Sequence, residues 1–240
     1  MQQGTIQNRD AFLDTIARKL GRSRLASLEA PRWKHHPQEE FMKGASPDEL
    51  LAAFKQNAAG VNCEVTVTTK AEVPQTVYGS IKNFGGGPVI TWKDARFEEW
   101  FGLGKLLKEQ LPGENIDVFE WDYTLGQQNI ERANTAKCSI TISEITLAES
   151  GTAVVFCDKD RGRTINFLPE NSIILVPKSS IVPRMTQAAR KIREMVKNGQ
   201  PVPSCINYIT GPSKSSDIEM KLVVGVHGPV RVNFIVVEDL

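Results

Sequence analysis

One turn near the C-terminus combines small residues, hydroxyl groups and a lysine. It follows the apolar run 206–210, which predicts a strand, and we expect a helix over 215–226 after it. The free backbone N–H groups at a helix N-terminus attract anions. In an open α/β sheet, ligands bind at the turns that follow the strands. The pattern therefore predicts a site for a small anionic ligand or cofactor, formed by Gly211, Ser213, Lys214, Ser215, Ser216 and Asp217.

Two features limit this interpretation. The GxxxxGK[ST] spacing of a phosphate-binding P-loop is absent, so the turn is not a Walker motif. Plain capping is the alternative, with Ser215 or Ser216 as the N-cap residue. Capping leaves the charge of Lys214 unexplained, because a cation opposes the positive end of a helix.

A second candidate is His227, the only histidine outside the N-terminal 45 residues. It lies in Gly225-Val226-His227-Gly228-Pro229, at the expected end of the 215–226 helix. The C-terminal end of a helix stabilises an imidazolium, so His227 can act as a general acid or contact an anion. The alternative is a histidine that caps the last carbonyl groups of its helix.

A third candidate is the carboxylate of Glu149, just before Gly151 and Thr152 at the start of a predicted strand. A carboxylate in such a turn can serve as a nucleophile or a base, and we place Gly151 and Thr152 among the binding residues. The alternative is a surface glutamate at a turn.

The four cysteines do not form a metal-binding pattern. Their spacing contains no CxxC pair, so neither a zinc ribbon nor an iron–sulfur site is predicted, and we predict no metal site. Each cysteine lies in or beside an apolar run, which favours small buried residues in a reducing cytoplasm. The cysteines are Cys63, Cys138, Cys157 and Cys205.

Composition excludes several classes of protein. The 240 residues carry a formal net charge of +1, with 40% hydrophobic and 24% charged residues, as in an ordinary folded domain. This charge argues against a general nucleic-acid or anionic-membrane binder. No apolar run approaches the ~18 residues of a membrane span, and the first residues lack the pattern of a secretory signal. We therefore expect a cytoplasmic protein.

The elements alternate between strands and helices. We expect strands over 64–68, 88–92, 116–121, 138–149 (interrupted by a turn), 152–157, 164–168, 172–176, 206–210 and 230–237. Helices are expected over 46–58, 71–83, 94–110, 126–137, 183–198 and 215–226. This alternation predicts an α/β fold with an open, mostly parallel sheet and helices on both of its faces.

The N-terminal part looks like an extension. A helix capped by Asn8 precedes a polar, irregular stretch, and the capping box at Ser46-Pro47-Asp48-Glu49 begins the compact part. We therefore divide the chain into an N-terminal helix and tether, 1–45, and an α/β domain, 46–240. The helix docks on a partner, on a second copy of the chain, or on its own domain.

Four stretches resemble the lactate utilisation protein C family, whose members carry a LUD domain. They are 148–152, 168–173, 211–219 and 225–229, and the long GPS…DIE…GVHGP string is the most specific. The resemblance spans nearly the whole chain, and the opening residues 4–9 look like the Bacillus-type members.

The resemblance implies a role in the oxidation of L-lactate to pyruvate, together with iron–sulfur partner proteins. It implies a fold similar to the isomerase and CoA-transferase type of α/β sheet. The family role is described as electron transport, but no residue here carries electrons, so either a bound cofactor such as a flavin or the partners would do so. The cofactor itself stays unknown.

Two other functions stay open. One is a free-standing CoA-transferase-like or sugar-phosphate isomerase-like enzyme. Its nucleophile or base would be Glu149, although Ala148 and Ser150 depart from the Ser-Glu-Asn-Gly pattern of CoA transferases. The other is an anion-binding module without turnover.

Overall fold

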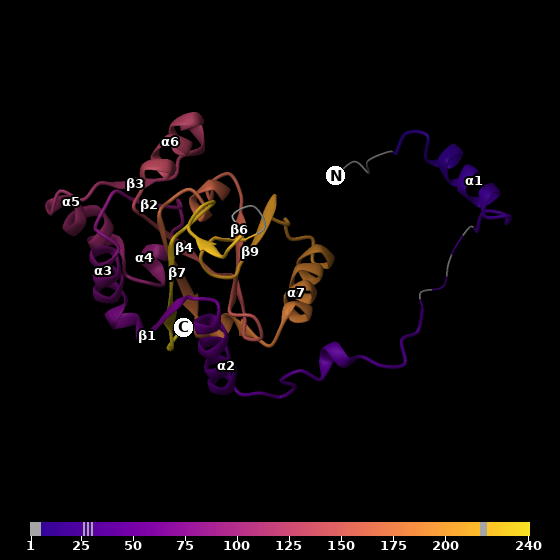
Figure 1. The fold of residues 1–240 in the computed structure, drawn as a ribbon, viewed down its shortest axis with the longest axis horizontal. Coiled ribbons are helices and arrows are strands. Elements are labelled where there is room, and N and C mark those ends of the chain that lie inside the picture. Colours follow the sequence, from indigo (N-terminus) through magenta and orange to yellow (C-terminus); the bar gives the residue numbers. More distant parts are fainter. Residues whose placement is uncertain (1–5, 26, 28, 30, 217–219) are drawn as a thin grey trace. The chain divides into compact units, whose positions relative to one another are not determined.

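The computed structural model describes residues 6–25, 27, 29, 31–216 and 220–240 (Figure 1). Contacts divide the chain into two compact units, 1–37 and 38–240. Among the described residues, no helix is long and apolar enough to cross a membrane.

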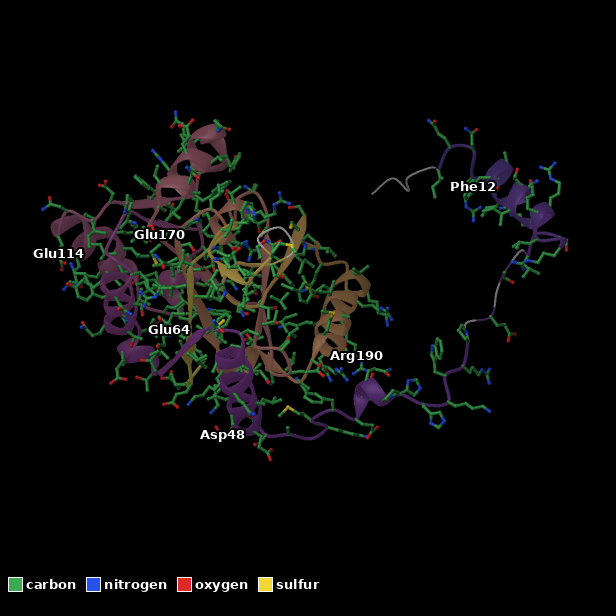
Figure 2. All side chains as sticks on the ribbon, in the orientation of Figure 1. Phe12, Asp48, Glu64, Glu114, Glu170 and Arg190 are labelled. Atoms are coloured by element: carbon green, nitrogen blue, oxygen red, sulfur yellow. The ribbon has the colours of Figure 1, made fainter. Side chains whose placement is uncertain are left out.

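The first unit contains one helix, α1 (Arg9–Lys19). Asn8 precedes it in a left-handed conformation (φ 58°) without a side-chain capping bond, so the predicted Asn8 cap is wrong. No residue of α1 is buried, and Phe12, labelled in Figure 2, is 64% exposed.

The second unit is built on a six-stranded parallel sheet, which confirms the predicted α/β class (Figure 1). From one edge to the other its strands are β1 (Glu64–Thr68), β12 (Arg231–Val237), β7 (Asn171–Pro177), β4 (Cys138–Ile142), β2 (Val89–Thr91) and β3 (Val118–Glu120).

Apolar side chains alternate between the two faces of this sheet, because successive residues of a strand point to opposite sides. Ile174 and Val176 of β7 join a core cluster with α2 (Pro47–Gly60), while Ile173 and Leu175 join one with α3 (Val73–Asn83). The predicted capping box of α2 is formed, with Ser46 Oγ accepting from the Glu49 N–H at 3.3 Å. Both faces of the sheet are thus covered.

A second sheet of four strands lies on the α2 side. Its order is β8 (Ile181–Val182), β5 (Ile145–Leu147), β6 (Thr152–Cys157) and β9 (Cys205–Ile209), and α7 (Met185–Lys197) packs on it. The turn predicted within 138–149 separates β4 from β5, so that expectation is confirmed. The division of the strands into two sheets was not predicted.

Three predicted elements are wrong. The helix over 94–110 is broken into α4 (Arg96–Glu99) and a π-helical turn (Leu106–Gln110) that runs into α5 (Leu111–Gly113), since Gly102 adopts φ +62° between them. The strand over 164–168 is a 3₁₀ turn, Arg163–Asn166.

The third correction concerns the helix over 215–226. Instead, β10 (Lys214–Ser215) pairs antiparallel with β11 (Val223–Val224). The β-branched pair of β11 favours a strand, and Gly225 follows it at φ +82°. Asp217 lies outside the described residues.

The remaining helical elements are short. They are α6 (Gln127–Thr135) and the 3₁₀ turns Pro37–Glu39, Lys70–Glu72, Tyr123–Leu125 and Lys178–Ser180.

Candidate functional site

The predicted binding turn lies against the C-terminal end of α2. Gly211 adopts φ +84°, and a Cβ atom there would lie 2.8 Å from the Val61 carbonyl oxygen and 2.9 Å from Cys63 Sγ. Lys214 Nζ donates a hydrogen bond to the same Val61 carbonyl at 2.8 Å. Only glycine fits at position 211, because a side chain would collide with the end of the helix.

This contact explains the charge of Lys214. The carbonyl groups at a helix C-terminus carry partial negative charge, so a lysine there is favourable. Lys214 therefore caps α2, and Ser215 belongs to the strand β10. The helix N-terminus on which the anion prediction rested is absent from the described residues.

The turn around Gly151 reaches the same end of α2. Gly151 adopts φ +60°, and a Cβ atom there would lie 2.6 Å from both Cα and N of Ala58. The hydroxyl groups of Thr152 and Thr210 are hydrogen-bonded at 2.7 Å, which ties this turn to the turn at Gly211. The structure thus brings Gly151, Thr152, Gly211 and Lys214 together around the C-terminal end of α2.

Glu149 turns to a different partner. Its Oε1 lies 2.9 Å from an Arg184 nitrogen, and the Arg184 guanidinium stacks over the ring of Phe41 at 5.3 Å. The carboxylate is therefore ion-paired at the start of α7.

His227 lies with Ser213 beside the beginning of β12. Its backbone N–H donates to Ser213 Oγ at 3.3 Å, and Ser213 N–H donates to the Pro229 carbonyl at 2.9 Å. The exposed His227 and Glu170 help to line a cavity of about 440 Å³. No helix ends at His227, so the expected stabilisation of its imidazolium by a helix does not apply.

A network of ion pairs lies at the carboxyl ends of β2 and β4. Arg96 Nη2 lies 2.6 Å from Asp94 Oδ2 and 2.6 Å from Glu144 Oε1. Arg161 binds the same Glu144 oxygen at 2.9 Å and Asp158 at 2.6 Å. Charged groups from three separate segments thus meet where the two strands end.

The comparisons with known proteins identify the family. The family model described as the LUD domain matches residues 51–237 of the chain. The chain belongs to the LUD domain family. It is 50% identical over 240 residues to "Lactate utilization protein C" of Bacillus subtilis (strain 168), covering 100% of both chains. It is 51% identical, with the same coverage, to the protein of that name from Geobacillus thermodenitrificans (strain NG80-2). The predicted resemblance is confirmed.

A solved structure supports the fold of this LUD domain. A DUF162 family protein from Deinococcus radiodurans matches with a TM-score of 0.55 and 19% identity, over 80% of this chain and 99% of that one. At this identity the similarity concerns the fold alone.

Cys157 and Cys205 of this LUD domain are cross-strand partners on β6 and β9, and none of the four cysteines forms a disulfide. Burial raises the pKa of Cys63 to about 12, that of Cys157 to about 11, and that of Cys138 above its ordinary value. These thiols stay protonated near neutral pH, and a protonated thiol is a poor nucleophile and metal ligand. Among the described residues, no three His, Cys, Asp or Glu side chains are grouped to hold a metal ion.

The ion-pair network of this LUD domain was not predicted from the sequence. Burial alone raises the pKa of Asp94, but hydrogen bonds and charge from Arg96 outweigh burial and leave that pKa below its usual value. The available signal was the pair Asp94 and Arg96 directly after a predicted strand. It gave no indication of Glu144 or Arg161, which are distant in the sequence.

We expect the contribution of Asp94 to stability to depend on pH. Its lowered pKa means that the charged form is favoured by folding, so the contribution is present above the ordinary pKa of 3.8 and is lost as the pH falls through the lower folded pKa. Asp94→Asn should lower the free energy of unfolding by about 1–3 kcal/mol at pH 7, because it leaves Arg96 with one partner fewer.

Urea unfolding from pH 7 to pH 3 checks this expectation. The difference between the wild type and Asp94→Asn should shrink below about pH 4, whereas Asp117→Asn, on an exposed side chain, should change little at any pH. A difference that persists undiminished at pH 3 contradicts the assignment.

Proposed function

We propose that this protein takes part in the use of L-lactate, by supporting its oxidation to pyruvate. The observation that carries the proposal is 50% identity, over the full length of both chains, with a protein named for lactate utilization. The matched LUD domain extends over residues 51–237, so it includes all the candidate site residues.

The proposal includes iron–sulfur partner proteins as electron carriers. Oxidation of lactate to pyruvate releases two electrons and two protons, and the electrons require an acceptor. Three of the four thiols have a pKa raised by burial, which suits a chain that leaves the clusters to its partners. In this assignment the chain binds the substrate or a cofactor within a larger assembly in the cytoplasm.

Lys214 supplies the charge for an anionic ligand. An ammonium group has three N–H donors, and Val61 uses one of them. Because the side chain is exposed, the other two can reach a carboxylate. Thr152, Ser213, Ser215 and Ser216 add hydroxyl groups, and Glu149 and His227 are the groups proposed to move protons.

Growth on lactate tests the role. The chain is expressed in Bacillus subtilis strain 168 from which its own lactate utilization protein C has been deleted. We expect growth on L-lactate to be restored while growth on glucose is unaffected. Failure to restore growth, with the folded chain present at the level of the native protein, would overturn the proposal.

Purified components test the electron route. The chain alone should not oxidise L-lactate in the presence of an artificial electron acceptor, and addition of the iron–sulfur proteins should produce pyruvate. Full activity of the isolated chain, or full activity of the partners without it, contradicts this division of labour.

We expect Lys214→Ala to weaken the binding of L-lactate or pyruvate. Loss of a charge-assisted hydrogen bond is worth about 1–3 kcal/mol, or roughly a 5- to 150-fold rise in Kd. Calorimetric titration of the purified chain measures this change, with the exposed Lys221→Ala as the matched control. Unchanged affinity in Lys214→Ala leaves capping of α2 as the only role of this lysine.

Glu149→Gln separates lactate utilization from a transferase-like reaction. A glutamate that forms a covalent adduct cannot be replaced by glutamine. Trapping a thioester adduct at Glu149 favours the transferase-like enzyme. In the proposed role, the wild type yields no adduct and Glu149→Gln slows growth on lactate, while the exposed Glu131→Gln has no effect.

A further inference from the structure

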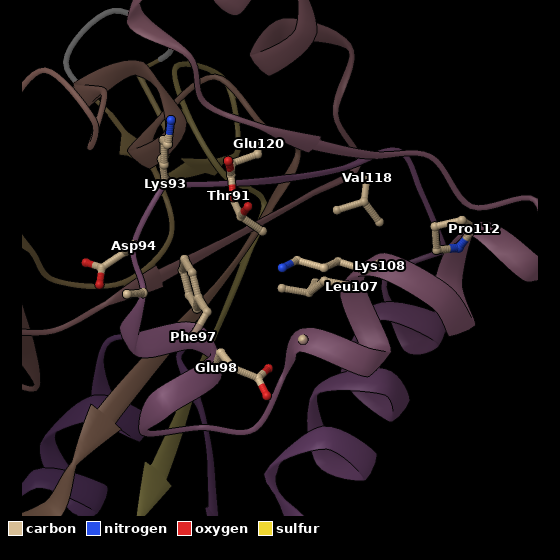
Figure 3. A pocket seen from close by; sticks show the side chains of 12 residues that line it. Thr91, Lys93, Asp94, Phe97, Glu98, Leu107, Lys108, Pro112, Val118 and Glu120 are labelled. Carbon is tan, nitrogen blue, oxygen red and sulfur yellow. The ribbon is translucent and has the colours of Figure 1, made fainter.

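A cavity of about 620 Å³ opens at the carboxyl ends of β2 and β3 (Figure 3). Thr91 ends β2 and Glu120 ends β3, while Phe97 and Lys108 come from the segment that connects the two strands. This volume falls within the range of small-molecule sites. The cavity is separate from the residues gathered at the end of α2.

The order of the strands places this cavity beside the point where ligands bind in open α/β sheets. From β2 the chain passes to β3 on one side, whereas from β4 it reaches β7 on the other side by way of β5 and β6 of the second sheet. Ligands bind at such a divergence, at the carboxyl ends of the strands. Arg96 and Glu144 form an ion pair at the carboxyl ends of β2 and β4, and Asp94 belongs both to that network and to the cavity wall.

The cavity walls combine one apolar region with charges of both signs. Phe97, Leu107 and Val118 supply the apolar surface, and the Lys108 side chain extends into the cavity toward Phe97 (Figure 3). A Cβ atom on Gly104 would lie 1.9 Å from Glu98 Oε2, so the glycine leaves room for this carboxylate.

These charges indicate what the ligand must carry. A ligand with only negative charge would suit Lys108 but not the carboxylates of Glu98 and Glu120. A ligand with hydroxyl donors, one anionic group and a flat apolar ring would match the carboxylates, the lysine and the apolar surface of the cavity. In a strand–helix–strand unit that binds nucleotides, a carboxylate at the end of the second strand accepts hydrogen bonds from the ribose. Glu120 occupies that position here.

We propose that this cavity binds a ribonucleotide. Lys108 holds the phosphate, Glu120 accepts hydrogen bonds from the ribose hydroxyl groups, and the ring packs against Phe97, Leu107 and Val118. The proposal goes beyond the role in lactate utilization and stands on the geometry of this cavity alone, so that either proposal can fail without the other.

Calorimetric titration of the full chain tests the site with four probes: ADP, 2′-deoxy-ADP, adenosine and NADH. We expect ADP to bind at least 10-fold more tightly than adenosine, which lacks phosphate, and about 5- to 10-fold more tightly than 2′-deoxy-ADP. Tighter binding of NADH than of ADP assigns the site to a dinucleotide. No binding of ADP or NADH at millimolar concentration overturns the proposal.

Two variants assign the contacts. Lys108→Ala should weaken binding of ADP at least 10-fold and leave that of adenosine unchanged. Glu120→Gln should abolish the preference for ADP over 2′-deoxy-ADP. The controls are Lys105→Ala and Glu109→Gln, which change exposed residues of the same segment outside the cavity lining. Both control variants should bind ADP as the wild type does. If both site variants also bind as the wild type, the nucleotide occupies another site and the proposal is wrong.

Discussion

Replacement of Arg96 by alanine is expected to lower the free energy of unfolding by about 2–4 kcal/mol. The guanidinium is only 16% exposed and joins Asp94, 10% exposed, to Glu144, 20% exposed. Removing one member of a largely buried ion pair is costly, because it leaves its partners charged in a poorly solvated place. Glu144 would keep Arg161 at 2.9 Å, but Asp94 would lose its closest partner and keep only the Arg161 nitrogen at 3.9 Å.

Urea unfolding at pH 7 measures this effect. Arg193→Ala, at an exposed position of α7, is the matched control and should change stability by less than about 0.5 kcal/mol. Arg96→Lys should recover only part of the loss, because Arg96 uses Nε and Nη2 on the two Asp94 oxygens at 2.9 and 2.6 Å, a fork that lysine lacks. Full recovery in Arg96→Lys contradicts the importance of the fork.

The same variant connects stability with the proposed nucleotide site. Asp94 and Phe97 flank Arg96 and line the cavity at β2 and β3. If the network holds this cavity wall in place, Arg96→Ala should also weaken the binding of ADP. The affinity for L-lactate, which is proposed to depend on Lys214, should stay unchanged.

Gly151→Ala is expected to have an effect of similar size for a different reason. The left-handed conformation at φ +60° costs an alanine about 1–2 kcal/mol. The added Cβ would also lie 2.6 Å from the α2 backbone at Ala58, which cannot move aside as a flexible side chain can. Overpacking adds about 1–3 kcal/mol, so we expect a total loss of about 2–5 kcal/mol.

Two glycine controls separate the cost of the left-handed conformation from the cost of the contact with α2. Gly199→Ala meets the same strain at φ +68° but has no atom within 4 Å of its Cβ, so it should show the conformational cost alone. Gly79→Ala, on an exposed position of α3 with no neighbour within 4 Å, should stabilise the protein by about 0.5–1 kcal/mol. Equal losses in Gly151→Ala and Gly199→Ala would show that the contact with α2 contributes nothing.

Gly151→Ala also tests whether the end of α2 matters for function. Thr152 and Lys214 depend on the position of the same helix end, since Thr152 bonds to Thr210 and Lys214 to Val61. We expect this variant to reduce growth on lactate even at a temperature where the chain stays folded.

The sequence by itself determined the class of the fold. The alternating run 64–68, the continuous apolar run 172–176 and the capping box at Ser46 are local signals, because each depends on residues within one element. The family motifs at 148–152 and 211–219 likewise identified the LUD domain.

Only the tertiary structure decided what the charged residues do. Lys214 bonds to the carbonyl group of Val61, which lies 153 positions away in the sequence. Arg96 bonds to the carboxylate of Glu144, at a separation of 48 positions. The helix expected over 215–226 gives way to the β10–β11 pair, because the backbone of Lys214 pairs with that of Val224 while its side chain caps α2. Such contacts depend on how distant segments pack, so no local sequence pattern predicts them.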